Sequence, residues 1–236
     1  MEAFLTSNSV QFEHHDLATD RDALEYLRAK GITTAPVTIV DDEVIIGYYP
    51  KKLISSLKLN VKVDLGANVD WLATKYDIVL SAAIRAVRQL SDTQLGKEVT
   101  WRPQTLGQHM LHVLSFPALA LRSAEHGSMS LEDMRASTEA LEWMATVEAI
   151  CRYGEQVRSE VASFLTSRNT DAFERVVNSH YGGEVTVLDL MTIILRHSTH
   201  HLKQAYHFME NNLGVSLKDP ATDADLEGIA TPTELF

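Results

Sequence analysis

Apolar residues recur at intervals of three and four over most of the chain after residue 68, the spacing that places side chains on one face of a helix. This pattern predicts four long helices at residues 69–90, 105–126, 137–165 and 184–212. Asn68 is the expected cap of the first helix, and Ser137 or Thr138 the expected cap of the third. Pro117 is expected to kink the second helix, and Gly127 to end it. Four such helices with long connections predict an antiparallel four-helix bundle.

The first sixty residues carry a different, mixed pattern. Apolar and polar residues alternate at Val10–His14, which predicts a strand, and Asp20 is the expected cap of a helix at residues 21–30. Two further strands, residues 36–40 and 43–49, are separated by the turn Asp41-Asp42, and Pro50 precedes a short helix at residues 51–59. The predicted order is β-α-β-β-α, a small α/β unit. We therefore expect a two-part α+β chain that is mainly α-helical.

Stretches without a sustained hydrophobic period predict where these parts are connected. Residues 61–68 lack one and contain Gly66, so we predict a linker between a first segment, 1–60, and the helical domain, 69–213. Residues 167–183 are expected to form a polar connection with a short helical patch at 171–177. Residues 214–236 are acidic and contain two prolines, which predicts an extended or loosely packed tail.

Composition narrows the functional class. The 236 residues have a formal net charge of −11, so the phosphates of a nucleic acid or an anionic membrane would be repelled, and we expect neither as a partner. Cys151 is the single cysteine, which excludes an internal disulfide and a Cys-x-x-Cys pair. No N-terminal run resembles a signal peptide, and no apolar run approaches the length of a membrane span. A cytoplasmic location is the expectation.

The fourth predicted helix carries the strongest chemical signal. His197 and His201 are four residues apart on a stripe that also holds Leu190, Ile194 and Ala205. Both imidazoles therefore point the same way and can bind one metal ion. The alternative is that they are histidines at the edge of the core, hydrogen-bonded to backbone or hydroxyl groups. A further histidine pair on the second predicted helix favours the metal site.

That pair is His109 and His112, three residues apart and each close to apolar neighbours. One of them, added to His197 and His201, gives three nitrogen ligands and leaves a coordination position open, the pattern of catalytic zinc sites. Imidazoles suit several divalent transition metals, including zinc, nickel and iron, so the sequence does not select one. No glutamate follows His197, which excludes the His-Glu-x-x-His protease mechanism.

The helical part resembles the DinB-like superfamily, metal-binding four-helix bundles that include bacillithiol and mycothiol S-transferases. The resemblance rests on Leu106-x-x-His109-Met-Leu-His112-Val113, on Arg196-His197-Ser-Thr-His200-His201-Leu-Lys-Gln204, on the run 181–190 and on tail residues 213–215 and 222–229. It implies that His197 and His201 are ligands and that His200 is not. A Leu-x-x-Leu-x-x-His-Val pattern favours His112 as the third ligand, whereas counting from Trp101 favours His109. The family commonly forms dimers, so a homodimer is expected.

The first sixty residues resemble the C-terminal three quarters of a glutaredoxin, within the thioredoxin-like fold. The matching features are residues 20–31, the segment Thr34-Ala35-Pro36-Val37, the turn Asp41-Asp42 and Gly47-Tyr48-Tyr49-Pro50. The resemblance implies a cis proline at Pro36 and binding of a thiol-bearing peptide beside Ala35 and Pro36. The family's first strand and its Cys-x-x-Cys would precede Met1, so the segment is expected to be truncated. It is then either a redox-inactive remnant that packs, dimerises or docks, or one that still binds a thiol peptide.

Two functions from different classes follow from these observations. The first is a divalent-metal-dependent S-transferase-like enzyme, or a hydrolase, that uses three histidines to activate a low-molecular-weight thiol or water. The second is a non-catalytic metal-binding scaffold or sensor whose N-terminal unit is a redox-inactive interaction module. An open coordination position favours the first, and a fourth protein ligand would favour the second.

Overall fold

The computed structural model describes residues 2–32, 36–46, 50–60, 65–181, 183–232 and 235–236. The chain divides into two compact units, residues 1–63 and 64–236. The division lies between Val63 and Asp64, within the stretch 61–68 where the sequence predicts a linker.

The first unit contains three short helices and one hairpin in the described residues. They are α1 (Glu2–Ser7), α2 (Arg21–Ala29), β1 (Val37–Val40), β2 (Glu43–Ile46) and α3 (Pro50–Ser56). The Asp20 side chain accepts a hydrogen bond from the Ala23 amide and so caps α2, as the sequence predicts. Strands β1 and β2 are antiparallel, with Val40 opposite Glu43 across the two-residue turn. Asp41 has a φ of 54°, the left-handed conformation that such turns favour.

The strand predicted at Val10–His14 is absent, and this prediction is wrong. Residues 10–16 have no regular secondary structure, and the side chain of Phe12 is 43% exposed. The alternating pattern is present, but in the described part of the unit no second strand pairs with it, and a strand needs partners for its backbone groups. The described order is α-α-β-β-α. Pro36 is exposed, while Ala35 and residues 47–49, also used for the glutaredoxin resemblance, lie outside the described residues.

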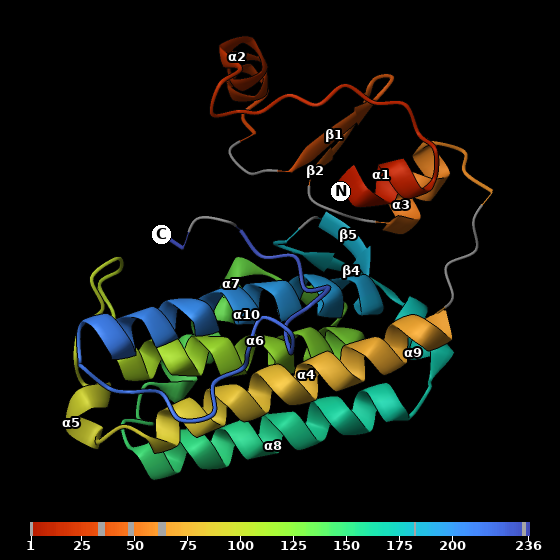
Figure 1. Ribbon diagram of the computed structural model, residues 1–236. Coiled ribbons are helices and arrows are strands. Elements are labelled where there is room, and N and C mark those ends of the chain that lie inside the picture. The colour runs from red at the N-terminus through yellow and green to blue at the C-terminus, as the bar shows by residue number, and fades with distance from the viewer. Residues whose placement is uncertain (1, 33–35, 47–49, 61–64, 182, 233–234) are drawn as a thin grey trace. The chain divides into compact units, whose positions relative to one another are not determined.

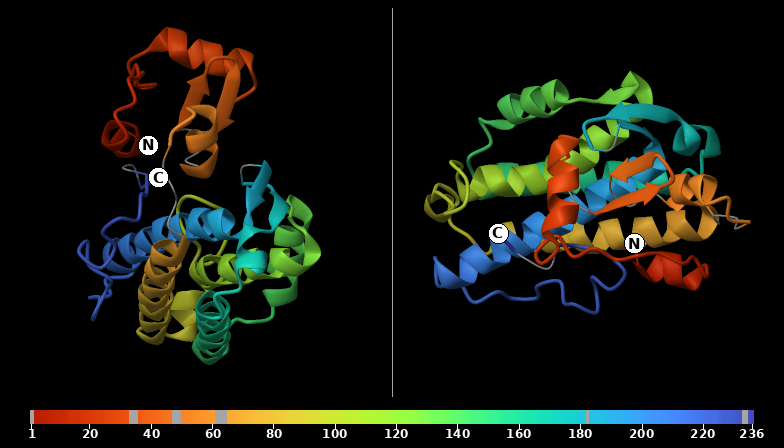
Figure 2. Two further views of the ribbon diagram at one scale, coloured as in Figure 1. Left: turned by 90° about the vertical axis from the view of Figure 1, so that its right-hand side faces the viewer. Right: turned by 90° about the horizontal axis from the view of Figure 1, so that it is seen from above.

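The second unit is mainly helical. Its four long helices in the described residues are α4 (Leu65–Arg88), α6 (Leu106–His126), α8 (Val147–Thr166) and α10 (Val187–Asn211). Figures 1 and 2 show them lying alongside one another, and α6 contacts each of the other three. The core between them includes Leu80, Ile84, Leu114, Ile150 and Ile194, all at most 1% exposed. Among the described helices, none is both long enough and apolar enough to span a lipid bilayer.

Local chemistry explains where helices α6 and α10 begin and where α6 ends. Thr105 Oγ1 accepts a hydrogen bond from the Gln108 amide, and Gln108 Oε1 accepts one from the Thr105 amide, which forms a capping box. Gly127 ends α6 with a φ of 81°, a conformation that favours glycine. Thr186 caps α10 by accepting from the Asp189 amide. The predicted range 105–126 is therefore confirmed for α6.

The other two long helices differ from the prediction at their starts. Helix α4 begins at Leu65, four residues before Val69, and ends at Arg88. The predicted third helix is two helices, α7 (Leu131–Leu141) and α8, so a start at Ser137 or Thr138 is wrong. The caps are Ser130 and Thr146, whereas the Thr138 hydroxyl donates to the Met134 carbonyl inside α7. Thr138 has the residue type of a cap but lies within a continuous helix.

The connections carry five short elements in the described residues, and the sequence analysis predicted only one of them, the helical patch at 171–177. They are α5 (Asp92–Leu95), β3 (Ser128–Met129), α9 (Thr170–Glu174), β4 (Val176–Ser179) and β5 (Gly183–Thr186). Strand β4 pairs with β3 in parallel and with β5 in antiparallel orientation. The predicted helical patch 171–177 thus ends at Glu174, where the chain continues into β4.

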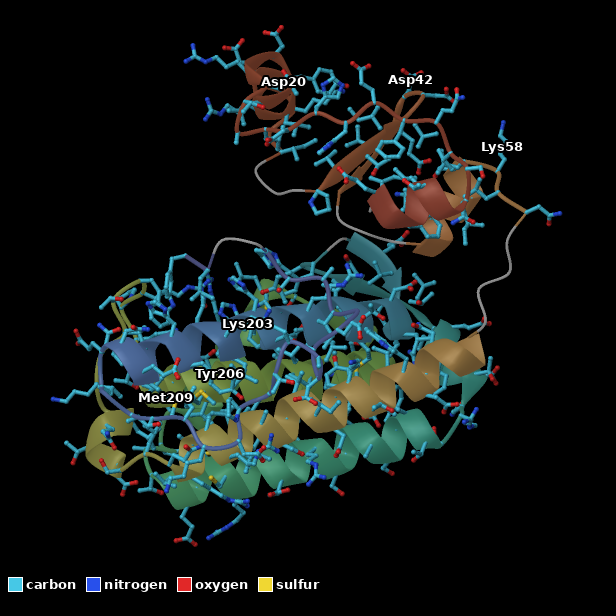
Figure 3. The ribbon with its side chains drawn as sticks, viewed as in Figure 1. Asp20, Asp42, Lys58, Lys203, Tyr206 and Met209 are labelled. Atoms are coloured by element: carbon cyan, nitrogen blue, oxygen red, sulfur yellow. The ribbon has the colours of Figure 1, made fainter. Side chains whose placement is uncertain are left out.

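The tail after residue 213 has no helix or strand in its described part, but several of its side chains are packed. Ala221, Leu226 and Ile229 are buried, so the expectation of loose packing is wrong for them. The Ala221 amide donates to the Tyr206 hydroxyl (3.1 Å) and the Val215 amide to the Met209 carbonyl (2.9 Å). Figure 3 shows Tyr206 and Met209 on α10, the helix that the tail follows.

Candidate metal centre

Three histidines from two helices converge in the second unit. His112 lies on α6, and His197 and His201 lie one turn apart on α10. One ring nitrogen from each lies within 4.8 Å of the others, and His112 Nε2 is 3.3 Å from His197 Nε2. The structure therefore brings together the three histidines that the sequence singled out, with His112 as the member from α6.

The register between α6 and α10 is held by a hydrogen bond beside the cluster. Pro117 lies inside α6 and has no amide hydrogen for the Val113 carbonyl one turn earlier. The buried Ser198 hydroxyl of α10 donates to that carbonyl at 2.9 Å. The expected interruption at Pro117 is thus accommodated within a helix assigned continuously from Leu106 to His126. Ser198 follows His197 directly, so this bond fixes the position of a candidate ligand.

The tautomer of His201 follows from a chain of hydrogen bonds. Gln204 Nε2 is 2.6 Å from the Leu235 carbonyl oxygen, which can only accept, so the amide nitrogen faces that carbonyl. Gln204 Oε1 then faces His201 Nδ1 at 2.6 Å, and this ring nitrogen must donate. The Nε2 atom of His201 therefore keeps its lone pair, as a metal ligand requires.

His109 occupies a different position in the same region. Its Nε2 is 2.9 Å from the His201 backbone carbonyl and must donate to it. Its Nδ1 is 2.8 Å from Gln104 Nε2 and accepts from that amide. Both ring nitrogens are thus used in hydrogen bonds, and His109 supports the backbone of His201.

His197 is enclosed by aromatic groups. The ring of Phe116 stacks on it at a centroid separation of 4.6 Å and an interplanar angle of 12°. The Tyr181 hydroxyl lies 3.4 Å from His197 Nε2, and Tyr181 is brought there by the turn after β4. His197 Nδ1 is buried and has no hydrogen-bond partner among the described residues. Aromatic walls exclude water from this side of the ring.

Burial keeps the imidazoles neutral. It is the largest cause that lowers the pKa of His112 to about 2 and that of His201 to about 3, and the neighbouring histidines add to the effect. The pKa of His197 is also lowered, and that of His109 falls to about 4. Neutral rings offer lone pairs, which is the state that binds a metal ion.

The arrangement of nitrogens fits a bound cation. His112 Nε2 and His197 Nε2 face each other at 3.3 Å, and a cation between them could bind a lone pair of each ring. Two nitrogens bound at about 2.0–2.1 Å to one tetrahedral ion are about 3.3–3.4 Å apart, so this separation suits a single shared ion. No carboxylate or thiolate joins the cluster among the described residues, which leaves an all-imidazole donor set.

The remaining histidines do not join the cluster. His200 lies next to His201, but its side chain is not part of the group of converging nitrogens. His207 is exposed on α10, and His126 is exposed at the end of α6. His14 and His15 lie in the first unit, where they contact Glu2 and Asp20.

A cavity of about 250 Å³ reaches the cluster at His112. Its lining comes from the loop before α6, from α6 itself and from α7 and its C-terminal end: Arg102, Pro103, Gln104, Gln108, Leu111, His112, Ser115, Thr138, Leu141 and Glu142. A small molecule entering it would meet one face of a candidate ligand. Cavities of this kind next to perturbed titratable groups are typical of binding sites.

The sequence reasoning missed four residues of this site: Arg102, Gln104, Tyr181 and Gln204. Gln204 could have been found, because it follows His201 by three residues and so lies on a neighbouring part of the same helical face. The other three come from loops and turns, whose positions no periodic pattern encodes.

The comparisons with known proteins agree with this site. The sequence profile of the DinB superfamily matches residues 75–205, more than half of the chain and entirely within the second unit. Neither the comparison with curated proteins nor the comparison with solved structures found a match. The matched range contains His112, His197 and His201. The chain therefore belongs to the DinB superfamily.

Proposed function

We propose that this protein is a divalent-metal-dependent thiol S-transferase-like enzyme. The observation that carries the proposal is the convergence of three neutral histidine nitrogens beside a cavity that reaches His112. Family membership supports metal binding, and the cavity supports a small-molecule substrate. The metal would be a transition metal such as zinc, nickel or iron.

The chemistry supplied by the ion is a lowered thiol pKa, so that the substrate thiol is present as thiolate near neutral pH. The thiol proton passes to solvent through the cavity. The thiolate then attacks an electrophilic carbon, so that a sulfur–carbon bond forms and the bond to the leaving group breaks. The leaving group departs with the bonding electron pair.

The protein's residues would bind and orient the reactants. His112, His197 and His201 would hold the ion through neutral ring nitrogens, with Gln204 fixing the His201 tautomer. Phe116 excludes water from His197. The Tyr181 hydroxyl, 3.4 Å from His197 Nε2, would orient a substrate group beside the ion. Burial raises the pKa of Tyr181, so its hydroxyl stays a hydrogen-bond donor at neutral pH.

The arrangement of the long helices and the fold of the first unit are also part of the proposal. We infer that α4, α6, α8 and α10 form an antiparallel four-helix bundle, which their mutual packing supports. We infer from the sequence resemblance alone that the first unit is thioredoxin-like, lacks redox activity, and contributes to a homodimer.

The test is metal content by elemental analysis of untagged protein. We expect about one metal ion per chain in the wild type, as a single three-histidine site holds one. His112→Ala, His197→Ala and His201→Ala should each lose it. His126→Ala and His207→Ala, which remove exposed histidines from the same two helices, are the matched controls and should keep it.

The metal-loaded wild type is then titrated with thiols and a reactive electrophile. Consumption of a thiol that stops in the His197→Ala variant would support the transferase. The proposal fails if metal-loaded protein neither binds nor consumes any low-molecular-weight thiol. Strong stabilisation by metal without thiol binding would instead favour the scaffold or sensor.

A further inference from the structure

The cavity beside His112 has a cationic group on its wall. Arg102 lies in the loop before α6 and lines the cavity together with His112. A single cavity of about 250 Å³ therefore has both Arg102 and the candidate ligand His112 in its lining.

The loop that carries Arg102 is held in place by backbone hydrogen bonds. Glu98 and Thr105 form a β-bridge that closes the loop, and the Val99 amide donates to the Gln104 carbonyl at 3.0 Å. The Gln104 amide donates to the Arg102 carbonyl at 2.8 Å. The loop then enters the capping box of α6 at Thr105. Arg102 thus projects from a fixed backbone, which reduces the entropy lost when its side chain binds a partner.

The charge of Arg102 is available for a ligand. Its side chain is exposed, and among the described residues it forms no ion pair within 4.0 Å. Glu142 lines the same cavity but is not within that distance of it.

The positive charge of Arg102 contrasts with the net charge of the chain. The protein has a net charge of −11, so an anion is repelled by the molecule as a whole and needs a local positive charge to bind. A bound divalent ion beside His112 would add to the positive charge of Arg102 at this cavity. A guanidinium also binds a carboxylate with two parallel hydrogen bonds, so a carboxylate is the anion that suits this position.

We propose that Arg102 is the specificity residue for a carboxylate on the substrate thiol, so that the cavity selects small anionic thiols over neutral ones. This inference rests on the proposed function for the position of the reacting group. The carboxylate binds at Arg102, and the sulfur lies toward His112.

The experiment follows thiol binding to the cobalt(II)-loaded protein through the sulfur-to-cobalt absorption band. Three probes of similar size are compared: 3-mercaptopropionate, 3-mercapto-1-propanol and cysteamine. We expect the anionic thiol to bind about tenfold more tightly than the neutral one, since a charge-assisted hydrogen bond contributes about 1.4 kcal/mol or more. Cysteamine should bind more weakly than either.

Three variants separate charge from structure. Arg102→Gln should remove the preference for the anionic thiol and leave the affinity for the neutral thiol unchanged. Arg102→Lys should keep part of the preference, because a lysine retains the charge but not the two-pronged geometry. Glu142→Gln, on the same wall, should not reduce the preference.

A second readout uses carboxylates without sulfur. Glutarate, but not 1,5-pentanediol, should shift the NMR signal of the Arg102 Nε–H group. Glutarate should also compete with 3-mercaptopropionate for the wild type but not for Arg102→Gln, and it should not compete with 3-mercapto-1-propanol.

The results distinguish failure of the role of Arg102 from failure of the proposed function. Equal affinity for anionic and neutral thiols in the wild type, or a preference that persists in Arg102→Gln, overturns the role of Arg102 and leaves the proposed function intact. A glutarate-induced shift with no cobalt–sulfur band overturns the proposed function and keeps the anion site. Absence of both the band and the shift overturns both.

Discussion

At the scale of single residues, the identity of the third histidine depends on what each ring nitrogen meets. His109 and His112 are three residues apart on α6, and helical spacing alone places both near α10. The structure distinguishes them because His109 Nε2 meets a backbone carbonyl, whereas His112 Nε2 meets the ring of His197. The carbonyl oxygen can only accept a hydrogen bond, so His109 Nε2 carries the hydrogen. His112 Nε2 faces another ring nitrogen instead, so its lone pair can bind a cation. The sequence patterns pointed to different residues, His112 by one pattern and His109 by another, because neither pattern contains what each ring nitrogen meets.

Gln204 gives a prediction at this scale. Gln204→Ala removes the acceptor for His201 Nδ1, so the ring can rotate and change tautomer. We expect metal affinity about 10–100-fold below that of the wild type, the usual effect of losing a hydrogen-bond partner of a ligating histidine. Competition with a chelator of known affinity measures it.

Gln204→Glu is the matched control for that variant. Its carboxylate still accepts from His201 Nδ1 but cannot donate to the Leu235 carbonyl, so it separates the two hydrogen bonds of Gln204. It should bind metal at least as tightly as the wild type. Wild-type affinity in Gln204→Ala would show that the ring is held by other contacts.

At the scale of elements, the sequence predicts helices better than strands. The ends of α6 were found because Thr105 and Gly127 leave strong local signals. Strands β3, β4 and β5 have two to four residues each, too few for a period to be recognised, and β3 pairs with a segment some fifty residues away. The start of α8 after Thr146 was missed because Ser137 and Thr138 are equally good capping residues.

The contact between α6 and α10 gives a prediction at this scale. Ser198→Ala leaves the buried Val113 carbonyl without its donor, since Pro117 cannot supply one. We expect the free energy of unfolding to fall by about 1–3 kcal/mol. Urea unfolding of the metal-free protein measures this change.

The double variant Ser198→Ala/Pro117→Ala tests whether the unpaired Val113 carbonyl causes the loss of stability. Alanine at position 117 has an amide hydrogen that can bond to the Val113 carbonyl within α6, so part of the lost stability should return. The coupling between the two substitutions should be at least about 0.5 kcal/mol. Strictly additive effects would mean that the loss in Ser198→Ala has another cause.

At the scale of the whole molecule, four buried neutral histidines link folding to pH. Their pKa values lie below 6.5 in the folded protein, at about 2, 3 and 4 for His112, His201 and His109. Between pH 6.5 and about 4 the unfolded chain therefore binds protons that the folded chain does not. The stability that these groups contribute is fully present above pH 6.5 and is lost as the pH falls through that window.

Metal-free protein should accordingly show a melting temperature that falls as the pH is lowered from 6.5 to 4.5. Each of these groups adds up to about 1.4 kcal/mol per pH unit to the slope of stability against pH. His112→Asn removes one of them and should give a shallower slope in the same thermal scans. A profile that stays flat across this range would contradict neutral burial of the cluster.

The bond from Ser198 to the Val113 carbonyl also bears on how the site discriminates between ions. Together with the bond from His109 to the His201 carbonyl, it prevents α6 and α10 from sliding past one another. The three candidate nitrogens are therefore spaced before any ion arrives. A metal site whose ligands cannot change their spacing rejects an ion of the wrong radius, however strongly that ion binds imidazole in solution.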